Sequence, residues 1–343
     1  MNVQPSARSP VGARQSMKTL LPWAVIASLV AVLFAWSPGY ISHLLVMLGI
    51  YLLLAYSLNL VMGYGGLIVF CHGLFYGIGA YAYALARVRL VATDPQAAVL
   101  WWAQGWSFLP ASLFAVVTGA VVAALVAWVC LRFRGEQFIF ATLGFQMIFF
   151  VVLYNCVDLS RGPSGIYGIP RPSLFGWSVT KPWQYSLLVG VVVVGVLLFL
   201  FRLYRSPFGL VLQTMREDER AARAMGVNTN EIALRAFAVA GGIAALAGSL
   251  YAGYVTYIDP SSFSLEESIF VVILLMLGGS GNIRGPFIGT VIMLALPEVL
   301  RFVGLPDAVA ANVRRMIYGA ALVAFIYWRP GGLAGTKTRH SQP

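Results

Sequence analysis

Apolar runs long enough to cross a lipid bilayer recur along almost the whole of this 343-residue chain. A helix needs roughly 20 apolar residues to cross a hydrocarbon core about 30 Å thick. Hydrophobic residues make up 59% of the sequence and charged residues 10%, whereas soluble domains carry roughly 25% charged residues. The sequence therefore predicts an all-α fold, a polytopic integral membrane protein with about 8–10 transmembrane helices.

The predicted spans form one membrane domain over residues 19–335, between tails at 1–18 and 336–343. They are Leu20–Trp36, Ile41–Met62, Leu67–Ala86, Pro110–Leu131, Phe138–Asn155, Tyr185–Phe201, Ala236–Tyr257, Ser268–Leu277, Pro286–Val303 and Arg314–Trp328. The eighth run is too short to cross alone, so we expect a half-helix there or a start nearer Ser261. The first run lacks a small-residue cleavage site, which indicates a retained helix rather than a signal peptide.

The net charge of +11 reflects membrane topology rather than a nucleic-acid surface, because the Arg residues sit singly or in small groups at the ends of apolar runs. If all ten runs cross and the N-terminus is cytoplasmic, 15 of the 23 Lys and Arg residues fall on the cytoplasmic side and 8 outside. This bias predicts that both tails and the loop at 202–235 are cytoplasmic. The three Cys residues are widely spaced and indicate neither a disulfide framework nor a metal site, and no cofactor is expected.

The loop Arg202–Arg235 is the most charged stretch of the chain. Ser206-Pro207 predicts the start of a short helix, Gly226 its end, and Asn228 or Thr229 the cap of another. The charged residues Arg216, Glu217, Asp218, Glu219 and Arg220 cluster on this short helix beside a small apolar face. That face consists of Ala221, Ala222 and Met225. The loop is either a solvated connector or a coupling helix whose small residues dock into a groove of a soluble motor.

Glycine-rich stretches precede two of the spans, at Gly63–Ala86 and Gly278–Gly289. Gly73 and Gly77 form a small-xxx-small pair that lets helix backbones approach closely in lipid, and tight packing is the alternative to a broken helix near a transport path. His72 is expected to bond a neighbouring helix rather than a substrate, and Glu298 to pair with Arg301 or lie near the outer surface.

The outer loop Ser160–Gly176 holds four Gly and three Pro residues, which exclude a regular helix and indicate a rigid lid or the mouth of a path. Several residues are therefore candidates for helix packing or for the translocation path. They are His72, Gly73, Gly77, Gly79, Thr142, Gly144, Gly162, Pro163 and Gly165.

Six stretches, in this order and spacing, resemble the M-type permease subunit of the branched-chain amino acid (LIV) ABC importers. They are GLFYGIGAYAYAL at 73–85, LRFRGEQFIFATLGF at 131–145, RGPSGIYGIPRPSLFG at 161–176, REDERAARAMGV at 216–227, VILLMLGGSGNIRGP at 272–286 and WRPGGL at 328–333. The resemblance covers residues 62–333. Two departures stand out, because the family commonly has Gly-Glu where this chain has Gln146-Met147, and Thr-Gly-Gly-Pro where it has Ser160–Pro163.

The resemblance implies a multi-pass permease of a bacterial inner membrane, working with a second related permease subunit, two cytoplasmic ATP-binding subunits and an external solute-binding protein. It places Glu217–Gly226 in the loop that contacts an ATPase. The expected function is ATP-driven import of branched-chain or related amino acids by alternating access, with no catalysis by this chain. The alternative solutes are urea, an amide or another small organic molecule.

Two further classes of function compete with an ABC permease. An intramembrane enzyme is disfavoured, because the sequence has no HExxH motif, no paired aspartates in spans and no Walker-type loop. An independent ion-coupled carrier would place several ionisable groups in its spans, and here such groups are scarce. The charge is instead concentrated in one loop, as an external motor would require.

Overall fold

The computed structural model describes residues 39–92, 108–174, 177–302, 316 and 319–320. Within these residues, five helices are long and apolar enough to cross a membrane, and the all-α polytopic membrane fold is confirmed. The predicted span Leu20–Trp36, almost all of Arg314–Trp328, and the tails 1–18 and 336–343 lie outside the described residues.

The described elements follow the predicted spans closely in order. The helices are α2 (Gly39–Leu58), the π-helix η1 (Asn59–Tyr64), α3 (His72–Ala92), α4 (Phe108–Cys130), α5 (Glu136–Asn155), α6 (Val157–Ser160), the 3₁₀ turn η3 (Gly162–Ser164), α7 (Pro182–Tyr204), α8 (Pro207–Glu217), α9 (Glu219–Ala224), α10 (Thr229–Val255), the 3₁₀ turn η4 (Pro260–Phe263), α11 (Leu265–Gly278) and α12 (Arg284–Phe302). The short strands are β1 (Ile166–Tyr167), β2 (Ser173–Leu174), β3 (Trp177–Ser178) and β4 (Tyr257–Ile258).

The prediction of one continuous helix from Leu67 was wrong at its start. Helix α3 begins at His72, and the residues between Gly65 and Cys71 are not helical. Gly66 has a φ of +72°, which a residue with a side chain rarely adopts, so the helical path of η1 stops there. The chain therefore returns into the bundle as irregular backbone before α3 starts.

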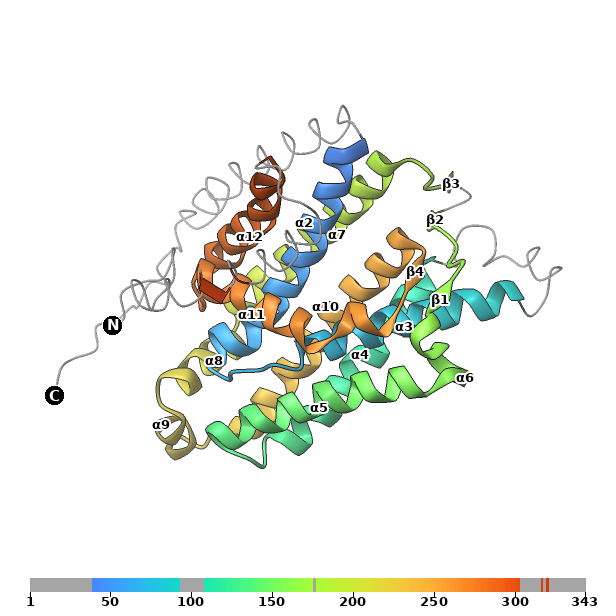
Figure 1. The fold of residues 1–343 in the computed structure, drawn as a ribbon. Coiled ribbons are helices and arrows are strands. Elements are labelled where there is room, and N and C mark those ends of the chain that lie inside the picture. The colour runs from blue at the N-terminus through green and yellow to red at the C-terminus, as the bar shows by residue number, and fades with distance from the viewer. Residues whose placement is uncertain (1–38, 93–107, 175–176, 303–315, 317–318, 321–343) are drawn as a thin grey trace, which may run out of the picture.

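Helix α10 forms the centre of the bundle, with α3, α4 and α2 packed against it (Figure 1). Glycines bring these helices together. A Cβ atom on Gly79 would overlap the backbone of Ala245, and one on Gly248 would overlap Tyr76 O. Gly119 and Gly241 make the corresponding close approach between α4 and α10. Close packing of small residues is a main source of helix association in lipid, where apolar surfaces gain little by meeting one another.

The bundle has two distinct ends (Figure 1). At one end β1 pairs antiparallel with β4, with Ile166 opposite Ile258 and Tyr167 opposite Tyr257. At the other end lie α8 and α9. We call these the β1/β4 end and the α8/α9 end.

The stretch from β4 to α12 crosses the bundle even though α11 has only 14 residues. Ile258 is paired at the β1/β4 end, whereas the backbone N–H of Gly281 bonds Asn59 near the α8/α9 end. The crossing consists of the 3₁₀ turn η4, with four residues, followed by the 14 residues of helix α11. The half-helix expected at Ser268–Leu277 is thus present, with its start at Leu265.

Helices α11 and α12 form a tight hairpin. A Cβ atom on Gly278 would overlap the carbonyl group of Gly285, and one on Gly285 would overlap that of Gly279. One on Gly289 would overlap Leu274 O. The glycine-rich stretch at Gly278–Gly289 therefore serves close packing between these two helices.

The α3–α10 contact predicts a large effect from the smallest possible substitution. Gly79→Ala adds one methyl group against the Ala245 backbone, which cannot move aside as a flexible side chain would. We expect a loss of about 1–3 kcal/mol of stability, the usual cost of overpacking, and lower abundance of the folded protein in membranes. Thermal unfolding of the detergent-solubilised protein measures this.

Gly190→Ala in α7 is the matched control, because no atom lies within 4 Å of its added Cβ. It should be neutral or slightly stabilising, since alanine favours helix more than glycine does. Equal melting temperatures for the two variants would show that the helices are not in close contact at Gly79.

Candidate translocation and coupling sites

The first turn of α3 is held by side chains from two other helices. The backbone N–H of Leu74 donates to Gln146 Oε1 at 2.7 Å, and that of Gly73 to Ser268 Oγ at 2.8 Å. Ser268 Oγ in turn donates to Gln146 Oε1 at 3.0 Å, and Gln146 Nε2 donates to Phe263 O at 2.8 Å. We call these five residues the junction. It joins α3, α5, α11 and η4 through hydrogen bonds that are all buried.

The junction satisfies groups that water cannot reach. The first N–H groups of any helix lack partners within the helix, and in a bilayer each unpaired group is costly. Here the two irregular stretches, residues 65–71 and η4, both lead into helices that meet at the junction. Broken helices that meet inside a membrane are typical of transport sites.

His72 shows how deep the junction lies. Its Nε2 is 2.6 Å from Ser57 Oγ, and both side chains are buried. Ser57 lies seven residues from the end of the 26-residue span Gly39–Tyr64, which corresponds to about 10 Å along the helix. His72 therefore starts α3 well inside the span and bonds a neighbouring helix, as expected.

Of the other predicted packing residues in the spans, Thr142 and Gly77 contact neighbouring segments and Gly144 does not. Thr142 is buried and accepts a bond from Phe70 N at 3.4 Å, so it holds the irregular stretch before α3. A Cβ on Gly77 would lie 2.7 Å from Phe149 and 3.0 Å from Phe263, so Gly77 makes room for two rings. Gly144 has nothing within 4 Å of an added Cβ.

The small-xxx-small expectation thus needs correction. A Cβ on Gly73 or Gly77 would lie nearest to the side chains of Ser268 and Phe149, and the nearest backbone atom given for Gly73 is Ser264 O at 3.4 Å. The close backbone contact of α3 is made by Gly79 instead.

Gly162 and Gly165 of the outer loop have backbone conformations that favour glycine. Gly162 and Gly165 have φ values of +55° and +67°, and both lie against backbone carbonyl groups, those of Tyr154 and Ile258. Pro163 lies in the 3₁₀ turn η3 between them. Arg161, where the family commonly has glycine, also has a positive φ of 59°, and its guanidinium group stacks over the Tyr167 ring at 5.0 Å. This loop lies at the β1/β4 end, with its backbone in conformations that suit glycine.

A buried arginine ties this loop to α3. Arg87 Nη2 donates to Arg171 O at 2.9 Å and to Pro170 O at 3.2 Å. The far end of α3 and the outer loop therefore lie at the same end of the bundle.

The α8–α9 loop is two helices rather than the single short helix expected. Asp218 ends α8 and caps α9, because its Oδ1 accepts bonds from Arg220 N at 2.8 Å and Ala221 N at 3.0 Å. Glu219 accepts from Arg223 at 2.6 Å and from Thr229 at 3.2 Å, while Glu217 and Arg220 are exposed. The predicted caps at Ser206 and Asn228 are present, and Gly226 ends the second helix with a φ of +83°.

The apolar face of this loop differs from the expectation in one respect. Ala222 is fully buried, in a cluster with Met215 and Ala233 of the same chain. Met225 is 69% exposed, and Ala221 is exposed as well. Met225, not Ala222, is therefore open to a partner.

Arg216 connects the end of α8 to the rest of the bundle. Its Nη1 donates to Gly63 O in η1 at 2.6 Å, and the same group lies against Gly281 in the α11–α12 turn. Asn59 completes the contact, since its Oδ1 accepts from Gly281 N at 2.9 Å and its Nδ2 donates to Asn282 O at 3.0 Å. We call this set of contacts the Arg216 link.

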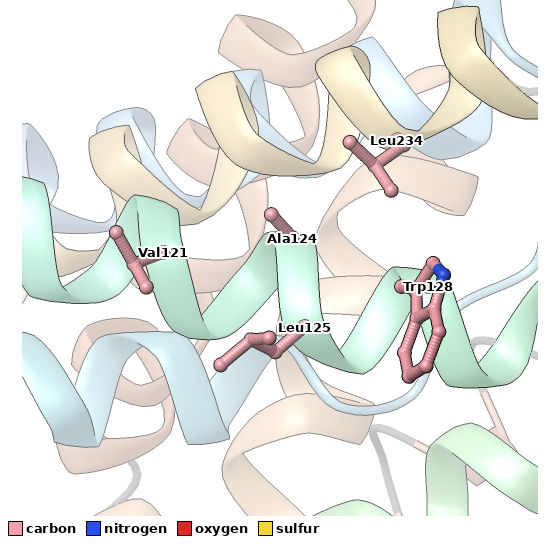
Figure 2. Close-up of a pocket in the computed structure, with 5 residues that line it drawn as sticks. All are labelled: Val121, Ala124, Leu125, Trp128 and Leu234. Carbon is pink, nitrogen blue, oxygen red and sulfur yellow. The ribbon is translucent and has the colours of Figure 1, made fainter.

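An apolar depression on the bundle surface carries no comparable polar chemistry. Figure 2 shows its lining residues, Val121, Ala124, Leu125 and Trp128 on α4 with Leu234 on α10. Several of these side chains are more than half exposed, and Arg132 stacks over Trp128 at 4.4 Å. A surface of this kind suits contact with lipid chains.

A family model described as branched-chain amino acid transport system / permease component matches residues 40–326. The chain belongs to this family. The M-type resemblance is confirmed, since the permease is 31% identical over 308 residues to the high-affinity branched-chain amino acid transport system permease protein LivM of Salmonella typhimurium. That alignment covers 83% of this permease and 67% of the relative.

Other relatives extend the comparison. The probable branched-chain amino acid transport permease protein LivM of Methanocaldococcus jannaschii is 27% identical over 331 residues, which are 87% of this permease and 94% of the relative. The permease protein LivH of Escherichia coli is 25% identical over 303 residues, or 83% and 91%. None of the solved structures matches. The permease is therefore a multi-pass membrane transport subunit and not an enzyme.

The residues that hold the two sites together carry little signal in the sequence alone. In the sequence, Gln146 stands out only as a departure from the family, Arg216 as one charge in a cluster and Ser268 as the start of a predicted span, and Asn59 does not stand out. A polar amide at the centre of an apolar run is a signal that could have singled out Gln146, because such a group must find partners in the membrane.

The junction predicts that Gln146→Leu is strongly destabilising. The substitution leaves Leu74 N and Phe263 O without the side-chain partner that they have in this buried place. At about 1–3 kcal/mol for each of the two unpaired groups, we expect a loss of about 2–6 kcal/mol. Thermal unfolding in detergent measures it, with Met147→Leu, 51% exposed, as the neighbouring control. If both variants melt alike, the junction does not stabilise the fold.

Proposed function

We propose that this chain is a permease subunit of an ATP-driven importer for branched-chain or chemically related amino acids. The family and the names of the relatives support this solute. The importer would contain a second related permease subunit, two cytoplasmic ATP-binding subunits and an external solute-binding protein. The relatives named LivH and LivM support the second permease.

The α8/α9 end is cytoplasmic in this proposal and the β1/β4 end external, in the inner membrane of a bacterium. The distribution of basic residues supports this orientation, because cytoplasmic loops carry an excess of Lys and Arg. Those at the α8/α9 end are Arg132, Arg134, Arg202, Arg205, Arg216, Arg220, Arg223, Arg235 and Arg284. The smaller set of described cations at the β1/β4 end includes Arg87, Arg161, Arg171 and Lys181.

The Arg216 link is the observation that carries the mechanism. It joins the α8–α9 loop to η1 and to the α11–α12 turn at once. Residues 65–71 follow η1, and α11 ends at the turn, so both segments that reach the junction begin or end at this link. Movement of the loop by a docked ATPase would therefore reach the junction along two routes. The partner ATPases supply the energy, and this chain moves solute by alternating access without covalent chemistry.

The exposed side chain of Met225, at the C-terminal cap of α9, predicts where the ATPase docks. Met225→Asp places a charge on a side chain that is 69% exposed, so the membrane domain should remain folded and abundant. We expect capture of the ATPases in a pull-down to fall at least about tenfold, equivalent to about 1.4 kcal/mol, together with uptake.

Ala222→Asp serves as the contrasting variant. Its charge would be buried between Met215 and Ala233, so it should lower the stability of the loop itself. If Met225→Asp retains both ATPase capture and uptake, the α8–α9 loop is only a connector.

The Arg216 link predicts a variant that binds the motor without responding to it. Arg216→Ala removes the bond to Gly63 O but leaves the exposed face of α9 intact. Capture of the ATPases should be unchanged, while solute uptake falls at least about tenfold at equal membrane abundance. Arg220→Ala is the matched control, since Arg220 is an exposed arginine four residues further on. Uptake within twofold of wild type in Arg216→Ala would contradict the proposed route.

A further inference from the structure

A carboxylate lies near the middle of the bundle, beside the junction. Tyr51 Oη donates to Glu267 Oε1 at 2.7 Å. Tyr51 is at the midpoint of the 26-residue helix Gly39–Tyr64, about 18 Å from either end at 1.5 Å per residue. Glu267 directly precedes Ser268 of the junction. A charged group at this depth in a membrane is costly, which makes it a functional candidate.

Aromatic rings from four helices surround this carboxylate. Tyr51 meets Phe270 edge-on at 5.3 Å between ring centroids, and Tyr76 lies 5.6 Å from Tyr251. Both Tyr76 and Tyr251 are close enough to Glu267 to interact with it electrostatically. The rings come from α2, α11, α3 and α10, so the group is built from segments far apart in the sequence.

Glu267 has no cationic partner among the described residues. The ion pairs of the described chain, Arg223–Glu219 and Arg235–Glu231, both lie at the α8/α9 end. Glu267, Tyr51 and Phe270 are each partly exposed, so the carboxylate is not sealed inside the bundle. Its charge is therefore left for a group that enters from outside the chain.

We propose that Glu267, with the rings of Tyr51, Phe270 and Tyr76, binds the ammonium group of the solute halfway along its path. A carboxylate forms a strong charge-assisted hydrogen bond with an ammonium group, and ring faces attract the same cation. This assignment rests on the proposed import function and narrows its solute to one that carries a primary ammonium group. Urea and simple amides are neutral and offer no such group.

A second tyrosine–glutamate pair in the same fold provides a matched comparison. Tyr40 donates to Glu298 across α2 and α12. Tyr40 is the second residue of α2, so this pair lies at the end of the span rather than at its middle. If the two pairs only held α2 against its neighbouring helix, loss of either glutamate should have the same effect on uptake.

The test compares Glu267→Gln with Glu298→Gln in the complete reconstituted importer, with saturating binding protein and radiolabelled L-leucine. Glu267→Gln should lower the uptake rate at least about tenfold at normal abundance and normal ATPase capture, while Glu298→Gln stays within twofold of wild type. Normal uptake by Glu267→Gln, or equal losses in both variants, would overturn the assignment.

A labelling experiment tests the site independently of the solute. Phe270→Cys, in a background without Cys71, Cys130 and Cys156, is treated with a cationic and an anionic methanethiosulfonate in the assembled complex. The ratio of cationic to anionic reaction rates should fall at least about fivefold when Glu267→Gln is added. If the wild-type importer does not take up L-leucine, the proposed solute is wrong, and this ratio alone decides the site: an unchanged ratio overturns it.

Discussion

The hydrogen bonds at the start of α3 are the constraint on which the rest of the structure depends. A helix that begins inside a bilayer exposes N–H groups where no water can satisfy them. Gln146 and Ser268 supply the missing acceptors, and Gln146 also donates to the irregular backbone at Phe263. One amide side chain thereby permits two breaks, one before α3 and one before α11.

The glycine contacts around α10 have a different role, because they set the distances between helices that the junction must span. Gly79 and Gly248 bring α3 against α10, and Gly119 with Gly241 do the same for α4. These contacts fix backbone against backbone, so they leave little freedom for the helices to slide. We therefore expect the centre of the permease, around α10, to be its most rigid part. The segments held by single side chains, at the junction and at the Arg216 link, lie around it.

Much of the fold could be predicted from the sequence, because long apolar runs and helix caps are local signals. The caps at Ser206 and Asn228 and the end at Gly226 depend on neighbouring residues alone, and each was predicted. Asp218 caps α9 only because α8 ends one residue earlier, at Glu217. The sequence does not mark that break, so Asp218 reads there as one member of a charge cluster. The burial of Ala222 depends on Ala233 and Met215, which local pattern does not place beside it.

The contacts of the candidate sites could not be predicted from the sequence either, because they join residues that are far apart along the chain. Tyr51 and Glu267 are 216 residues apart, and Arg216 and Gly63 are 153 apart. No periodicity within one run connects such pairs. The family resemblance singled out the α8–α9 loop and the outer loop as candidate sites, but it could not show that Gln146 accepts hydrogen bonds from the start of α3.

The tight packing of α11 on α12 has a mechanical consequence. Backbone lies against backbone at Gly278, Gly285 and Gly289. We therefore expect α11 and α12 to move together as one body about the α11–α12 turn. Glu267 lies eleven residues from Gly278, roughly 17 Å along the helix axis at 1.5 Å per residue. A tilt of only about 5° at the turn would displace the carboxylate by roughly 1.5 Å over that length, enough to lengthen a hydrogen bond beyond its useful range. A small rotation delivered through Arg216 would therefore be amplified into release of whatever Glu267 holds.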